Sequence, residues 1–268
     1  MATRDTRGNY QKLEQQAMEF HEKQAPDAVA IFLDGYNMLL RGHDPLQRYS
    51  FGQAVEQRVI MALFIKTLNS LRCIYELATR GYFIQALNLL RTPVEDWMGY
   101  WFLRNFPERH PEFTTAGSEP PSFNDMLQAI ESRQNEVRKQ EGKPALGPDP
   151  RVRAWLKQLH QYSHLSRIGV RAIMTIDQVF TNYHLGPDED EGRFRLCIAE
   201  ALQVIGAHLE ALDNFRRLVG QPPIDGLGAY IDSVESWQKS QPGIIDALER
   251  RTATASPAAP SAGTGPTP

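Results

Sequence analysis

Apolar side chains recur every three or four residues along most of the chain, which is the period of one face of an α-helix. The clearest case is a seam that repeats at alternating steps of four and three residues and stops before Gly220. Its members are Phe194, Ile198, Ala201, Ile205, His208, Leu212, Phe215 and Val219. Such a seam packs against other helices of a bundle. We expect His208, its one polar member, to be a hydrogen-bonded core residue.

The same period predicts the remaining helices and the ends of two of them. The helices cover residues 1–25, 50–80, 82–106, 122–141, 151–183 and 224–251, with loops over 42–50 and 142–150. Gly81 suits a left-handed cap at the end of one helix. Pro93 removes a backbone hydrogen bond and should kink the next helix near Leu89.

The predicted fold class is therefore all-α, a single helical bundle of roughly seven to nine helices. Its expected parts are an N-terminal surface helix at 1–25, a bundle core at 26–219, a C-terminal helical extension at 220–251 and a disordered tail at 252–268. The tail is expected to be disordered because it carries no charge and no aromatic residue.

The segment 28–41, AVAIFLDGYNMLLR, allows two interpretations. As a helix it is largely apolar, with Gly35 as a weak point and Asp34 at its solvated edge. As a strand it resembles the first strand of NYN/PIN-type nucleases, and the resemblance implies that Asp34 helps to hold a catalytic metal. Those nucleases need further carboxylates from later strands, whereas the long segments that follow have helical period. This favours the helix and leaves the strand as the alternative.

The most apolar and aromatic stretch, Leu71–Phe106, carries two charges inside its apolar run. Arg91 and Glu95 lie one helical turn apart, so an ion pair between them is geometrically easy. If the pair is buried, it costs desolvation and gives little net stability, and a polar ligand or a fixed helix register would then explain it. The alternative is a structural pair at the edge of the bundle.

Composition narrows the class of protein. The 268 residues are 41% apolar and 23% charged with a net charge of −3, which is ordinary for a globular protein and gives no overall attraction to nucleic acid or anionic membranes. Cys73 and Cys197 lie inside apolar helical patterns, so we expect buried, reduced thiols and a cytoplasmic protein. The N-terminus lacks a signal-peptide core, and no run of apolar residues predicts a membrane span.

A basic stripe is predicted on the helix that begins at 151. Arg153, Lys157, His160, His164, Arg167 and Arg171 are spaced 4, 3, 4, 3 and 4 residues apart. Two histidines one turn apart could bind a metal, but Gln161 stands where a zinc protease would need glutamate and no third ligand is evident, so we predict no metal. The stripe is either a solvated face or a surface for phosphate or RNA, with a histidine acting near neutral pH.

Two family resemblances bear on these residues. GYFIQALNLLRTPVEDW and the later LHQYSHLSR are similar to a family of bacterial all-helical proteins without an assigned activity. The matching positions, within 55–215, are Ala86, Leu90, Arg91, Glu95, Tyr162, His164 and Ser166. Separately, Arg153 and His160 have the spacing found in HEPN-type ribonucleases. That resemblance implies a metal-independent RNA cleavage across a homodimer, with His160 as acid–base and Arg153 stabilising charge on the phosphorus centre.

Two classes of function follow. The leading hypothesis is a binding or interaction module whose polar pocket is formed by Arg91, Glu95, Tyr162 and His164 and accepts a small molecule or a protein. The alternative is a HEPN-like endoribonuclease of toxin or phage-defence type that uses Arg153 and His160 on RNA. Neither hypothesis calls for a cofactor or a membrane, and the sequence does not decide whether the protein is an enzyme.

Overall fold

The computed structural model describes residues 6–47, 54–147, 152–155, 157, 174–176, 181–183, 187–241 and 243. Within these residues the bounds of nine α-helices, one 3-10 helix and two short strands are defined. They are α1 Thr6–Gln24, α2 Pro26–Gln47, α3 Val55–Thr79, α4 Phe83–Leu89, α5 Arg91–Asn105, η1 Pro107–Arg109, α6 Pro111–Thr114, α7 Phe123–Gln140, β1 Met174–Ile176, β2 Thr181–Tyr183, α10 Glu191–Leu218 and α11 Leu227–Lys239. The predicted helical bundle is confirmed.

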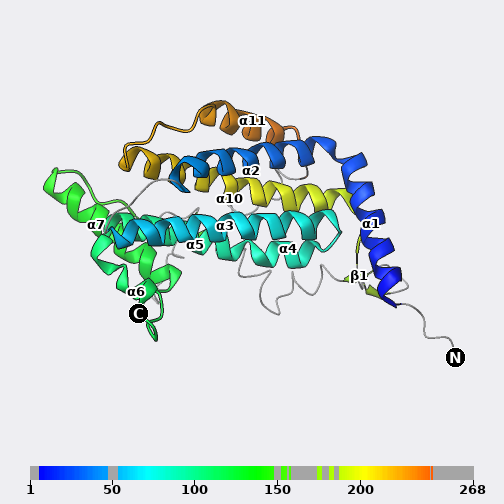
Figure 1. Cartoon of the computed structure of the whole chain (residues 1–268), viewed down its shortest axis with the longest axis horizontal. Coiled ribbons are helices and arrows are strands. Elements are labelled where there is room, and N and C mark those ends of the chain that lie inside the picture. The colour runs from blue at the N-terminus through cyan, green and yellow to red at the C-terminus, as the bar shows by residue number, and fades with distance from the viewer. Residues whose placement is uncertain are drawn as a thin grey trace, which may run out of the picture.

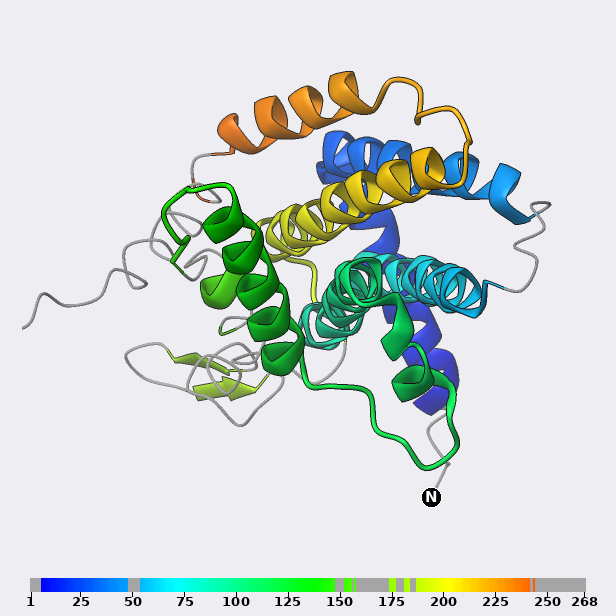
Figure 2. The same ribbon diagram turned by 90° about the vertical axis from the view of Figure 1, so that its left-hand side faces the viewer.

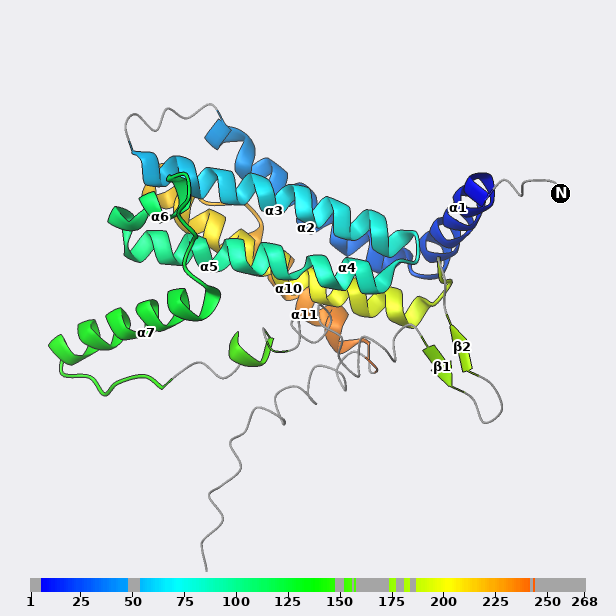
Figure 3. The ribbon, with the colours of Figure 1, turned by 90° about the horizontal axis from the view of Figure 1, so that it is seen from below.

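The long helices lie side by side along the length of the molecule (Figure 1). Helix α10 is central, because it packs against α2, α3, α4, α5 and α11. Helix α11 covers the outer side of α2 and α10 (Figure 2). Figure 3 shows α7 and the end of α5 at one end of the bundle, and α1 at the other. None of the helices in this described part has both the length and the apolar composition needed to cross a membrane.

The seam on α10 forms the middle of the core, as its spacing predicts. All eight seam residues are buried, seven of them almost completely. His208 is hydrogen-bonded, as expected: its Nδ1 lies 2.9 Å from the carbonyl oxygen of Val204 and its Nε2 lies 2.9 Å from the hydroxyl of Thr67. Because the carbonyl can only accept, Nδ1 carries the hydrogen and the Thr67 hydroxyl donates to Nε2. Burial lowers the pKa of His208 to about 4, so the ring is neutral at pH 7.

Two predicted helix ends are also confirmed. Helix α3 ends before Gly81, whose φ of 80° is left-handed, and the Tyr82 amide closes the cap on the Leu77 carbonyl at 2.8 Å. The irregularity expected near Leu89 is an interruption at one residue, because α4 ends at Leu89 and α5 begins at Arg91, while Leu90 between them keeps helical dihedral angles. Pro93 thus lies in the first turn of α5, where its missing N–H leaves no helical hydrogen bond unmade.

The ambiguous segment 28–41 is helical, which excludes the nuclease-like strand and places Asp34 on an exposed helix face. The loop predicted over 42–50 is wrong for 42–47, since α2 continues to Gln47 with Pro45 inside it. Gly42, His43 and Leu46 are buried. They extend the apolar face of α2 by another turn, which explains why the helix does not stop at the glycine.

The helix predicted over 151–183 is wrong for the described residues 174–176 and 181–183, which are strands. Residues 152–155 are helical, but β1 and β2 form an antiparallel pair in which Met174 lies opposite Tyr183. The segment is rich in β-branched and aromatic residues, including Thr175, Ile176 and Thr181. These types favour strands, and the hairpin follows that local preference. The predicted tail at 252–268 lies outside the described residues.

The two thiols differ from each other. Both cysteines are free, and Cys197 is buried as predicted, whereas Cys73 is exposed, so that prediction is wrong for Cys73. The Cys197 thiol donates to the Phe83 carbonyl oxygen at 3.6 Å, and burial raises its pKa. Cys73 lies on an apolar run of α3, but that run surrounds the helix and not every face of it is covered.

Asp27 at the start of α2 joins three helices. Its carboxylate accepts two hydrogen bonds from Arg195 of α10, at 2.7 and 2.9 Å, and one from the indole of Trp237 on α11, at 2.8 Å. The Arg195 guanidinium is the main reason why the pKa of Asp27 falls to about 2. The ionised form of Asp27 therefore stabilises the folded state.

We expect this contribution to be lost in acid. Because the folded pKa is below the unfolded value of 3.8, the stabilisation is complete above pH 4 and disappears as the pH falls towards 2. The side chain is 45% exposed, so the effect is about 1 kcal/mol after screening. Urea unfolding between pH 5 and pH 2 should show a shallower acid dependence for Asp27→Asn. Asp34→Asn, on the exposed face of the same helix, should keep the wild-type dependence, and equal curves for both variants would contradict the assignment.

Candidate ligand-binding pocket

A pocket of about 780 Å³ lies at the end of the bundle where α5 meets α7. Its apolar wall comes mostly from Trp97, Met98 and Trp101 of α5 and from Leu127 and Ile130 of α7. The segment after α7 and Asn214 of α10 complete it. A cavity of this size and character is typical of small-molecule sites.

The aromatic side of the pocket is produced by helical spacing. Trp97, Trp101 and Arg104 stand four and then three residues apart, so α5 presents them on one face. Trp97 also packs edge-on against Trp155, with ring centroids 6.4 Å apart. The pocket is therefore bordered by three indoles, two of which line it directly.

Several polar groups of the pocket have hydrogen-bonding capacity left. The amide oxygen of Asn214 accepts from the Tyr100 hydroxyl at 2.7 Å, which leaves its NH₂ group for a ligand. The NH₂ group of Asn105 donates to the Trp101 carbonyl at 2.7 Å, which leaves its oxygen. Arg104 is exposed at the rim, and in the described part of the chain its guanidinium forms no ion pair.

One ion pair stands beside the apolar wall. Arg153 donates to Oε2 of Glu131 at 2.9 Å. Among the described residues, Oε1 of Glu131, Nε of Arg153 and Nε1 of Trp155 are buried without a hydrogen-bond partner. Such atoms are unusual, because each costs about 1–3 kcal/mol when it is left unpaired. Of these three residues Glu131 lines the pocket, so a ligand or ordered water there would reach its Oε1.

The rim is held in place by α7. Asn135 bonds both backbone groups of Leu146, accepting from its N–H at 2.7 Å and donating to its carbonyl at 3.1 Å. Arg138 donates to the carbonyl oxygen of Pro144 at 2.7 Å. These contacts fold the chain after α7 back onto the helix, so this edge of the pocket is formed before any ligand binds.

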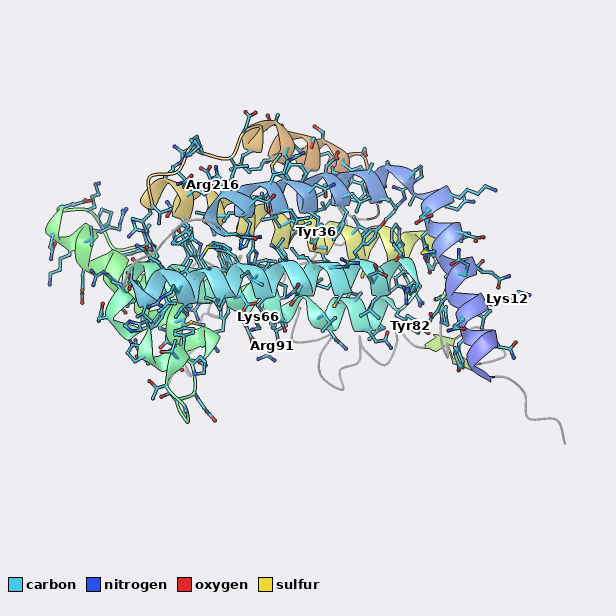
Figure 4. The ribbon with its side chains drawn as sticks, viewed as in Figure 1. Lys12, Tyr36, Lys66, Tyr82, Arg91 and Arg216 are labelled. Carbon is cyan, nitrogen blue, oxygen red and sulfur yellow. The ribbon has the colours of Figure 1, made fainter. Side chains whose placement is uncertain are left out.

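Arg91 and Glu95, which the sequence indicated as site residues, lie outside this pocket. Arg91 and Glu95 form the expected ion pair at 2.7 Å, but their side chains are 41% and 38% exposed. Figure 4 shows Arg91 pointing away from the bundle. Neither belongs to the lining of the α5–α7 pocket. The buried acidic residue of α5 is Asp96, which follows Glu95 in the sequence. Its carboxylate accepts a hydrogen bond from Lys66 at 2.8 Å, and burial raises its pKa. Of the predicted site residues that the structure describes, Arg153 forms an ion pair with a residue that lines this pocket, Glu131.

Three predicted site residues, His160, Tyr162 and His164, lie outside the described residues. The convergence of Tyr162 and His164 with Arg91 and Glu95 therefore stays a prediction, as does the pairing of Arg153 with His160. Within the residues that the structure describes, no cluster of three or more His, Cys, Asp or Glu side chains could hold a metal ion.

Comparisons of the chain with family models, with curated proteins and with solved structures gave no match. Its function must therefore be argued from the pocket itself. Sequence reasoning did not single out Trp97, Trp101, Arg104 or Asn214. The spacing of the first three on α5 is a signal that was present in the sequence.

Proposed function

We propose that the protein binds a small molecule in the pocket formed by α5, α7 and α10. The observation that carries the proposal is the lining of this 780 Å³ cavity by Trp97 and Trp101, next to polar groups that have unused bonding capacity. Indole faces supply apolar area and stacking, and a few polar groups give orientation, which is the usual composition of a ligand site.

Like the leading sequence hypothesis, this proposal makes the protein a binding module. It places the binding site in the α5–α7 pocket and not at Arg91 and Glu95. Arg91 and Glu95 contact each other on an exposed face, where a ligand would compete with water and with the existing ion pair. The α5–α7 pocket instead offers a concave and mostly apolar surface. A cytoplasmic location remains part of the proposal and is supported by two cysteines that form no disulfide.

Blocking the pocket tests the proposal. Gly147 lines the cavity, and a Cβ added there would meet no atom within 4 Å, so a substitution there does not clash at its first side-chain atom. We expect Gly147→Trp to weaken binding of aromatic small molecules at least tenfold, a loss of about 1.4 kcal/mol. Ligands are first found in a broad thermal-shift screen of aromatic compounds and are then measured by isothermal titration calorimetry.

The matched control is Gly228→Trp on α11, where a Cβ also meets no atom within 4 Å but which lies outside the pocket. It should bind like the wild type. A screen without any ligand would overturn the proposal, and so would ligands that bind both tryptophan variants equally.

The ribonuclease alternative rests on the spacing of Arg153 and His160 and makes an opposite prediction. The guanidinium of Arg153 is engaged by Glu131, so an RNA phosphate would have to displace that carboxylate. If this alternative holds, the purified protein cleaves RNA and His160→Ala abolishes cleavage. Under the binding proposal there is no cleavage to abolish.

A further inference from the structure

The charges around the pocket do not balance. Within the described residues the lining carries one carboxylate, Glu131, and one guanidinium, Arg104. Glu131 is already neutralised by Arg153 at 2.9 Å. Arg104 therefore remains as a positive charge beside the indoles of Trp97 and Trp101, without a carboxylate of the described chain to pair with it.

Hydrogen-bond donors point to the same class of ligand. The NH₂ group of Asn214 is left for the pocket once its oxygen accepts from Tyr100. Asn214 and Arg104 both line the apolar cavity and both carry donor groups. A cationic ligand would find indole faces here, but Glu131 already pairs with Arg153 through Oε2, so the ligand would add a second positive charge beside Arg104.

Resting on the proposed function, we infer that the ligand is a planar aromatic acid. Its ring packs against Trp97 and Trp101, and its carboxylate binds the Arg104 guanidinium at the rim. Guanidinium and carboxylate match in a bidentate geometry, which fixes the orientation of the ligand as well as adding affinity. The contact is exposed to solvent, so it should weaken in salt.

The test uses three probes that share one ring. Indole-3-acetate is the anion, indole-3-acetamide is its neutral isostere and tryptamine is a cation. Calorimetric titration of the full chain at pH 7 and low salt should give an acetate affinity about five- to tenfold above that of the acetamide, and tryptamine should bind most weakly. Raising the salt concentration should reduce the difference between acetate and acetamide.

Arg104→Gln should abolish the preference for the acid, so that acetate and acetamide bind with similar affinity. Arg58→Gln is the matched control, because Arg58 is exposed on α3 and does not line the pocket. It should retain the full preference. Circular dichroism of both variants shows whether the fold is intact.

The outcomes separate the inference from the proposed function. Equal affinity for acetate and acetamide, tighter binding of tryptamine, or a preference that survives Arg104→Gln would overturn the aromatic acid while the pocket still binds a ligand. Failure of all three probes also overturns it. The proposed function itself falls only if the broad screen finds no ligand, or if its ligands ignore Gly147→Trp.

Discussion

Phe215→Ala is expected to lower the free energy of unfolding by about 4 kcal/mol. The ring is fully buried on α10, and its centroid lies 5.9 Å from that of Phe64 on α3 and 6.5 Å from that of Tyr100 on α5. Alanine removes these contacts and leaves a cavity that three packed helices cannot close completely. The measurement is urea unfolding followed by circular dichroism.

Leu218→Ala provides the control, because Leu218 lies on the same helix but is 45% exposed. It should change the free energy of unfolding by less than about 1 kcal/mol. Similar losses in the two variants would mean that the seam of α10 is not the centre of the core. Since Tyr100 bonds the pocket residue Asn214, Phe215→Ala should also weaken ligand binding in the α5–α7 pocket.

Helix α10 could be predicted from the sequence because the spacing of its apolar residues alone indicates a buried helix. Apolar residues at alternating steps of four and three leave a continuous stripe, and a stripe of that length is stable only when other helices cover it. The end of α3 was equally predictable, since Gly81 adopts a conformation with φ of 80° that most other residues avoid. Both features depend on local chemistry that a single sequence displays.

The segments that were predicted wrongly depend on contacts that the sequence does not display. Gly42 resembles a helix end, but α2 continues because its next turn is buried. Leu212 of α10 and Ile224 of the loop after α10 lie close to Gly42. In 174–176 and 181–183 the helical period competes with the strand preference of β-branched residues, and these residues form strands. In each case the local sequence favours no single structure strongly, so tertiary packing or neighbouring residues determine which structure forms.

The candidate site illustrates the same limit. Leu71–Phe106 contains both the charges that drew attention, Arg91 and Glu95, and the pocket face that carries Trp97, Trp101 and Arg104. Charges inside an apolar run suggest burial, yet exposure depends on which face of α5 its neighbours cover. The tryptophan face borders the pocket, which residues of α7 and Asn214 of α10 also line. Asn214 lies more than a hundred residues away in the sequence and can be assigned to the pocket only from the fold.

Gly35→Ala is expected to cost about 3 kcal/mol, although the same change inside a helix ordinarily stabilises it by about 1 kcal/mol. A Cβ at this position of α2 would overlap the Tyr230 hydroxyl of α11 and would lie 2.8 Å from Cγ2 of Ile205 on α10. Both side chains are buried and cannot move aside freely. Gly35 thus looks like a weak point of its helix but is required for the close approach of three helices.

Two comparisons isolate this cause in thermal and urea unfolding. Gly206→Ala, within α10, adds a Cβ that meets no atom within 4 Å, so it should raise the free energy of unfolding by about 0.5–1 kcal/mol. In a Tyr230→Ala background most of the overlap is gone, and Gly35→Ala should then cost less than about 1 kcal/mol, a coupling of about 2 kcal/mol or more. If Gly35→Ala and Gly206→Ala instead stabilise the protein alike, α11 does not pack on α2 as described. If the cost persists without Tyr230, Ile205 is the residue that excludes a side chain at position 35.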